Sequence, residues 1–148
     1  HFGFLIFYLA CGLAAAAAQI AANPAEGIPM VGASGAIAGV MGGYLLLCPK
    51  ARVDVIAIII IYIKKLTIPA WVMLGLWFLL QIFSSFATMG GDSGVAYWAH
   101  AGGFVAGIIF ALPIFLKLGG TTFWDRTHGH PPHQPIEYVR SRVPDVRR

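Results

Sequence analysis

The feature that most constrains this chain is a series of long apolar runs that few charged residues interrupt. The runs cover residues 2–22, 33–47, 68–86 and 95–116. A helix needs about 20 mostly apolar residues to cross a bilayer core of about 30 Å, and three of these runs approach or exceed that length. We therefore predict an all-α, polytopic helical membrane protein with about four transmembrane helices.

The composition excludes the other common classes of protein. Charged residues make up 11% and hydrophobic residues 58% of the 148 positions, whereas soluble domains carry roughly 25% charged residues. Intrinsic disorder requires low hydrophobicity and high charge, which is the opposite of this composition. The net charge of +4 is not gathered on one folded basic face, so we expect no nucleic-acid partner.

The positions of the basic residues predict the orientation in the membrane. The residues that flank the apolar runs are Lys50, Arg52, Lys64, Lys65 and Lys117. The connections at 23–30 and 89–94 contain no Lys or Arg. The positive-inside rule then places the basic connections and the C-terminus in the cytoplasm. If residues 53–63 also spanned, Lys50 and Lys65 would lie on opposite faces, so we expect this segment to lie at the cytoplasmic boundary without spanning.

Two regions follow from this pattern: a membrane core over residues 1–118 and a tail over residues 119–148. The tail is rich in Pro, His and Arg and lacks apolar periodicity, so we predict a disordered cytoplasmic segment. Its histidines could ligate a metal, but no Cys or acidic partner completes a site, and we expect no metal or cofactor. Its arginines could contact anionic lipid. These side chains are His128, His130, His133, Arg140, Arg142, Arg147 and Arg148.

Two polar residues inside the apolar runs, Ser34 and His100, are candidates for chemistry. Ionisable groups within the membrane are costly, which makes His100 a functional candidate by default. From the expected helix ends, Ser34 lies about 9 Å and His100 about 7–8 Å below the outer surface. The matching depth fits a nucleophile and its general base. The alternatives are a packing serine and a histidine bonded to a backbone carbonyl.

Small residues recur every four positions beside both candidates. Gly35 and Gly39 follow Ser34, and Gly103 and Gly107 follow His100. Such faces let helix backbones approach closely in a bilayer, so we expect these glycines to pack the two helices together. Ser34 begins its helix, where its free backbone N–H could stabilise an oxyanion.

The sequence resembles the rhomboid family of intramembrane serine proteases over about residues 2–118. Gly32-Ala33-Ser34-Gly35 looks like the family's G-x-S-G signature, and the segment from Ala99-His100 to Gly107 is similar to its A-H-x-x-G-F-x-x-G motif. Residues 48–53, and 68–71 on to Gln81, also resemble bacterial members. The resemblance implies a multi-pass protein, in the bacterial cytoplasmic membrane, that cleaves transmembrane protein substrates near the extracytoplasmic face. It makes Ser34 the nucleophile and its N–H an oxyanion donor, with His100 as general base and then acid.

The sequence departs from the family pattern at two points. Members have two earlier core helices and a His-x-x-x-Asn pair that completes the oxyanion hole, and nothing here matches them. We therefore expect upstream helices of the same protein to be missing and the isolated chain to show little activity. In some relatives an aromatic residue one turn after the serine stacks on the histidine. That position is Ala38 here, so either Tyr97 or Trp98 makes the stacking contact or no residue does. The alternative function is a non-catalytic rhomboid-like protein that binds transmembrane helices; a transporter or channel is a weaker third.

Overall fold

The computed structural model describes residues 1–24, 32–59, 62–87 and 95–132. In chain order the elements are α1 (Phe2–Ala22), α2 (Ser34–Leu47), β1 (Arg52–Ile59), β2 (Tyr62–Pro69), α3 (Ala70–Ala87), α4 (Tyr97–Lys117) and α5 (Thr121–Thr127). The expectation of a helical polytopic membrane protein is confirmed, and the two strands are an addition that the apolar runs did not predict.

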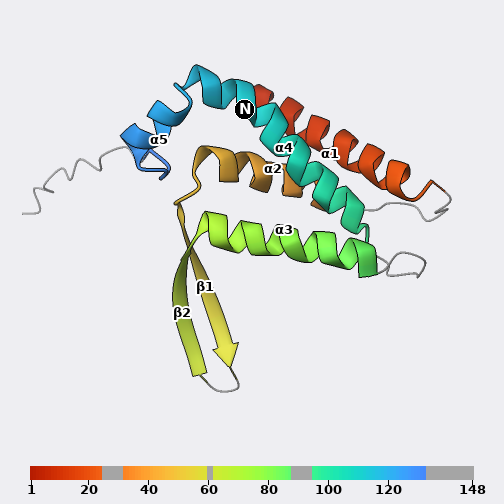
Figure 1. Ribbon diagram of the computed structural model, residues 1–148, viewed down its shortest axis with the longest axis horizontal. Coiled ribbons are helices and arrows are strands. Elements are labelled where there is room, and N and C mark those ends of the chain that lie inside the picture. Colours follow the sequence, from red (N-terminus) through yellow and green to blue (C-terminus); the bar gives the residue numbers. More distant parts are fainter. Residues whose placement is uncertain (25–31, 60–61, 88–94, 133–148) are drawn as a thin grey trace, which may run out of the picture.

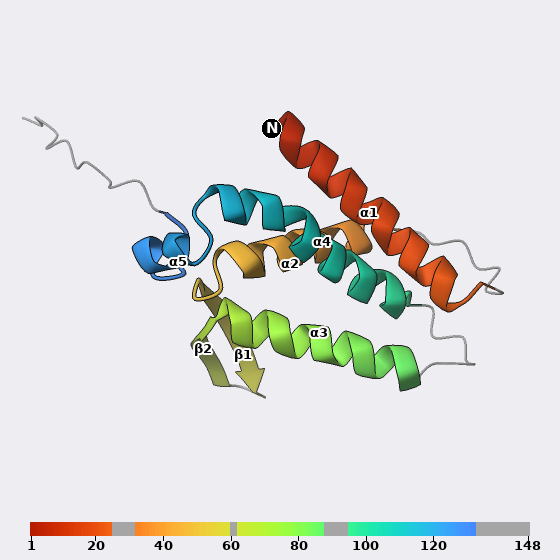
Figure 2. The ribbon, with the colours of Figure 1, turned by 45° about the horizontal axis from the view of Figure 1, so that its top comes forward.

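Helices α1 to α4 lie side by side, with α1 and α3 running in one direction and α2 and α4 in the other (Figure 1). The most extensive contact joins α2 to α4; α1 packs against both, and α3 packs mainly against α4. We call the end at which α2 and α4 begin the Ser34 end. The opposite end, where α5 lies, is the α5 end (Figure 2).

The bundle places small residues inside and large apolar residues outside. Most of its buried hydrophobic residues are alanines, whereas Phe2, Leu13 and Phe83 are more than 70% exposed. A soluble protein would bury these large side chains. In a bilayer the lipid tails are as apolar as Leu, so small residues at the helix contacts are what allow close packing.

In the part of the chain that the structure describes, three helices are long and apolar enough to cross a membrane: α1, α3 and α4. Helix α2 is apolar but has 14 residues, which corresponds to a length of about 21 Å. It lies inside the bundle against α1 and α4. The structure thus supplies three candidate spans and a shorter apolar helix where the sequence indicated about four spans.

The segment expected at the boundary forms a β-hairpin with the beginning of the next run. Strands β1 and β2 pair antiparallel, from Arg52 opposite Pro69 to Ile59 opposite Tyr62. Residues 68 and 69 therefore belong to β2, and α3 begins at Ala70 instead of residue 68. The hairpin extends crosswise to α3 from the α5 end (Figure 1). Its many β-branched residues favour strands, a signal that the length of an apolar run does not carry.

The prediction of a disordered tail from residue 119 is wrong for its first part. Helix α5 occupies Thr121–Thr127 and buries Phe123. The indole N–H of Trp124 donates to the carbonyl of Leu46 at 3.0 Å, and its ring lies 4.8 Å from that of Phe115. Trp124 and Leu46 are 78 positions apart, so the tail's local composition did not reveal this contact.

Parts of the sequence predictions fall outside the described residues. These parts are most of the two connections without basic residues, together with His133, Arg140, Arg142, Arg147 and Arg148.

Candidate active site

Ser34 is the first residue of α2, at the end of a turn that requires glycine. Gly32 has φ of +115°, a conformation that side chains rarely adopt, and it directs the chain into the helix two residues before Ser34. At the first helical position the Ser34 amide has no acceptor within its own helix. Ser34 is exposed among the described residues, so its hydroxyl and amide are presented at the rim of the bundle.

His100 lies in the first turn of α4 and meets Ser34 directly. Its Nε2 atom is 2.9 Å from the Ser34 Oγ atom. The two residues are 66 positions apart in the sequence. They meet because helices α2 and α4 run in the same direction and both begin at the Ser34 end (Figure 1). A hydroxyl and an imidazole at this distance form the pair that activates a serine nucleophile.

Gln81 on α3 contacts the second ring nitrogen of His100. Its Oε1 atom lies 2.8 Å from His100 Nδ1. An amide oxygen can only accept, so this contact places the imidazole proton on Nδ1. The lone pair of Nε2 is then free to accept the Ser34 proton. The three side chains form a line from α3 through α4 to α2, in which a neutral amide orients the histidine.

Trp77 is the aromatic neighbour of His100. The two ring centroids are 6.0 Å apart at an interplanar angle of 38°, whereas Trp98 makes an edge contact with Phe86 at 5.3 Å. The structure therefore supplies the aromatic contact from α3, and not from Tyr97 or Trp98. Trp77 and Gln81 are four positions apart and therefore share a helix face. The sequence carried this signal, because Gln81 is the one amide side chain in the apolar run 68–86.

Gln19 on α1 fixes the start of α4. Its side chain is buried, and its Oε1 atom accepts from the Ala99 N–H at 3.1 Å. The first amides of a helix lack partners within the helix, so this bond satisfies one of them. The residue next to Ala99 is His100. Gln19 thus ties the backbone that carries the imidazole to a helix from the beginning of the chain.

Glycines bring α2 and α4 into backbone contact below the Ser34–His100 pair. A Cβ atom on Gly103 would collide with the carbonyl oxygen of Gly35, and one on Gly107 would collide with that of Gly39. Gly39 also lies against Cys11 of α1. Any larger residue would separate the helices and move Ser34 away from His100.

The described part of the site contains no carboxylate near His100. The ring contacts that the structure shows for it are with Ser34, Gln81 and Trp77. Within the described residues, no three His, Cys, Asp or Glu side chains gather as a metal site. The polar contacts that the structure shows for the imidazole are thus a hydroxyl on one ring nitrogen and an amide oxygen on the other.

The sequence also matches a known protein family. The family model described as Rhomboid domain matches residues 1–117, a range that contains both Ser34 and His100 and all four helices of the bundle. No curated protein and no solved structure matches the chain. On the strength of the family match over most of its length, the chain belongs to the rhomboid family.

Proposed function

We propose that the protein is an intramembrane serine protease that cleaves transmembrane segments of other membrane proteins. The observation that carries the proposal is the 2.9 Å contact between Ser34 Oγ and His100 Nε2, with the proton of the imidazole held on the opposite nitrogen by Gln81. The rhomboid family includes serine intramembrane proteases, so the geometry and the family point to the same reaction.

The proposed reaction proceeds through an acyl-enzyme. His100 Nε2 accepts the Ser34 proton as Oγ attacks the carbonyl carbon of the scissile peptide bond. The imidazolium then donates this proton to the leaving amine nitrogen, and the C–N bond breaks. A water molecule, deprotonated by His100, attacks the ester, and Ser34 recovers its proton. Throughout, Gln81 Oε1 accepts the hydrogen bond that the Nδ1–H group donates.

The start of α2 supplies an electrostatic contribution to the transition state. The Ser34 amide lies at the positive end of the helix dipole and has no acceptor within its helix. A donor placed at a developing oxyanion contributes roughly 2.7–4 kcal/mol in characterised enzymes. We assign the Ser34 N–H as one such donor.

The same proposal includes a placement in the membrane. Lys50, Arg52 and Lys117 lie at the α5 end, and the positive-inside rule assigns that end to the cytoplasm. Ser34 then lies toward the extracytoplasmic face, and substrates would be cut near that side. The proposed location is the bacterial cytoplasmic membrane, which the resemblance of residues 48–53 and 68–81 to bacterial members supports.

The proposal is tested with an activated serine-directed phosphonate applied to the protein in membranes, together with cleavage of a membrane-anchored reporter. Ser34→Ala should abolish labelling and cleavage because it removes the nucleophile. His100→Ala should lower both strongly because Ser34 then lacks a base. Thr122→Ala and His128→Asn are matched controls at the α5 end, where Thr122 bonds within its own turn and Asn tolerates the positive φ of His128.

Labelling that persists in Ser34→Ala, or a folded wild-type protein that is never labelled, would contradict the proposal. The alternative, a non-catalytic protein that binds transmembrane helices, predicts a different result. Partner capture would then survive both substitutions, and no reporter would be cleaved. Retention of the Ser–His contact favours the enzyme over this alternative.

A further inference from the structure

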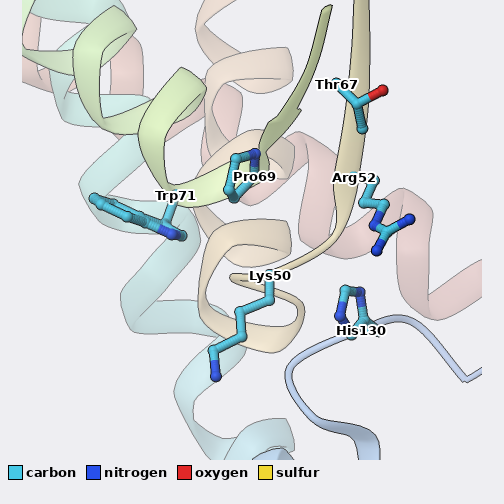
Figure 3. Close-up of a pocket in the computed structure, with 6 residues that line it drawn as sticks. All are labelled: Lys50, Arg52, Thr67, Pro69, Trp71 and His130. Atoms are coloured by element: carbon cyan, nitrogen blue, oxygen red, sulfur yellow. The ribbon is translucent and has the colours of Figure 1, made fainter.

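A pocket of about 500 Å³ opens at the α5 end of the molecule, away from the Ser34–His100 pair. Its lining residues are Lys50, Arg52, Thr67, Pro69, Trp71 and His130 (Figure 3). They come from the connection after α2, both strands, the first turn of α3 and the segment after α5. Ser34 is the first residue of α2 and Lys50 follows its last residue, Leu47, so this pocket and the Ser34–His100 pair are about 20 Å apart along the helix.

The pocket is lined by cationic groups without a carboxylate. Figure 3 shows the Arg52 guanidinium directed toward the ring of His130. Lys50 and Trp71 lie on the opposite side of the pocket, and the Lys50 side chain extends away from Arg52. Asp54 on the hairpin is already engaged: it pairs with Lys65 at 2.9 Å and accepts from Thr67 at 2.8 Å. Within the described residues, neither Lys50 nor Arg52 forms an ion pair.

The docking of α5 builds one wall of this pocket. The Lys50 N–H donates to the carbonyl of Gly129 at 2.9 Å, and a Cβ at Gly129 would press against the Lys50 side chain at 3.2 Å. Gly129 has φ of +72°, so a residue with a side chain would be strained there. The turn at Gly129 and the contacts of Trp124 together hold His130 beside Arg52.

The surroundings of the pocket have the character of a membrane interface. One face of the hairpin carries Arg52, Asp54, Lys65 and Thr67. The register places Val53, Val55, Leu66 and Ile68 on the other face, together with Lys64 farther from the pocket. Among these, Val53 packs against the core of the bundle. Trp71 is 57% exposed at the beginning of a candidate span. Exposed tryptophans at helix ends are typical of the headgroup level of a bilayer.

We propose that this pocket binds the phosphate-bearing headgroup of an anionic phospholipid. Lys50 and Arg52 attract the phosphate, since basic pockets at the cytoplasmic ends of transmembrane helices suit such headgroups. Trp71 contacts the glycerol and upper acyl chain, which a free phosphate lacks, and this contact favours a lipid as the source. The inference does not rest on proteolytic activity, because the pocket and the Ser34–His100 pair share no residue.

The test measures binding to the full chain in a neutral detergent by native mass spectrometry. The probes are dihexanoyl phosphatidylglycerol, dihexanoyl phosphatidylcholine and inorganic phosphate. We expect phosphatidylglycerol to bind most tightly. Lys50→Gln and Arg52→Gln should each weaken it about fivefold, and the double variant more than tenfold, as expected for one interfacial cation each. Lys117→Gln is the matched control, because it removes one exposed cation from the same end outside the pocket, and should change the affinity less than about twofold.

Several outcomes would overturn the inference. An equal loss in Lys117→Gln would show non-specific attraction, and equal affinity for phosphatidylcholine would show that the anionic headgroup is not recognised. Inorganic phosphate that binds as tightly as the lipid would assign the pocket to a free phosphate. Circular dichroism checks that each variant is folded. If the double variant is unfolded, Arg52→Lys is compared with Arg52→Gln. Arg52→Lys keeps the positive charge and should retain phosphatidylglycerol binding, whereas Arg52→Gln should weaken it.

Discussion

In the proposed reaction, three side chains each have a separate role. Ser34 supplies the hydroxyl, His100 the base, and Gln81 the acceptor that selects the tautomer. A carboxylate in that position would bring a net charge into an apolar bundle, and buried charge is expensive. A neutral amide orients the imidazole without that cost.

Gln81 is therefore expected to be a positioning residue. Gln81→Leu should lower kcat up to about tenfold with little change in KM, because a hydrogen bond of this kind contributes about 1 kcal/mol. Gln81→Glu keeps the acceptor and should retain more activity than Gln81→Leu. The ¹⁵N chemical shifts of the His100 ring provide a second measurement, since they distinguish a proton on Nδ1 from one on Nε2.

If Gln81 only stabilises the fold, the expected results differ. The tautomer would then be unchanged in Gln81→Leu, and activity would follow thermal stability in both variants. That result would remove the orienting role while leaving the Ser34–His100 pair untouched.

At the scale of the elements, the contact between α2 and α4 determines whether the site exists. Gly107→Ala should destabilise the bundle by about 1–3 kcal/mol, because the new methyl group would collide with the Gly39 backbone and force the helices apart. Gly75→Ala on α3 is the matched control, since nothing lies within 4 Å of its Cβ position. Unfolding in detergent would be measured for both, and equal destabilisation would contradict the packing explanation.

The hairpin should show a dependence on pH that originates at Asp54. The hydrogen bonds from Lys65 and then from Thr67 hold the pKa of the Asp54 carboxyl below its ordinary value. A carboxyl with a lowered pKa in the folded state stabilises that state above its unfolded pKa of about 3.9. The contribution is lost as the pH falls through the lower, folded value.

Amide hydrogen exchange across β1 and β2, corrected for the intrinsic rate, would measure this effect between about pH 7 and about pH 3. Opening of the hairpin should become easier at the acid end in the wild type. Asp54→Asn removes the titrating group and should flatten the dependence. If Asp54→Asn keeps the full dependence of hydrogen exchange on pH, that dependence does not originate at Asp54.

At the scale of the whole molecule, the two ends of the bundle carry different chemistry. The Ser34 end presents the serine and histidine, whereas the α5 end carries the basic residues, the hairpin and the docked α5 (Figure 1). In the proposed orientation these ends lie on opposite sides of the membrane. The reaction and the proposed lipid contact would then occur at opposite leaflets.

This orientation can be measured with single cysteines in a background where Cys11 and Cys48 are replaced. Ala87→Cys at the Ser34 end and Asp125→Cys on α5 are both exposed positions. A membrane-impermeant maleimide added outside intact cells should label Ala87→Cys at once. It should label Asp125→Cys only after the membrane is permeabilised. The reverse pattern would overturn the proposed orientation.

Local patterns in the sequence determined the helical membrane class and the approximate extent of α1, α2, α3 and α4, because apolar length and glycine spacing are properties of neighbouring residues. They also singled out Ser34 and His100, because polar groups are rare in such runs. Only the tertiary structure decided which other residues join them. Gln81 and Trp77 reach His100 from α3, Gln19 reaches α4 from α1, and Trp124 docks α5 on α2. These contacts join residues far apart in the chain, and they form only when the packed helices bring their surfaces together.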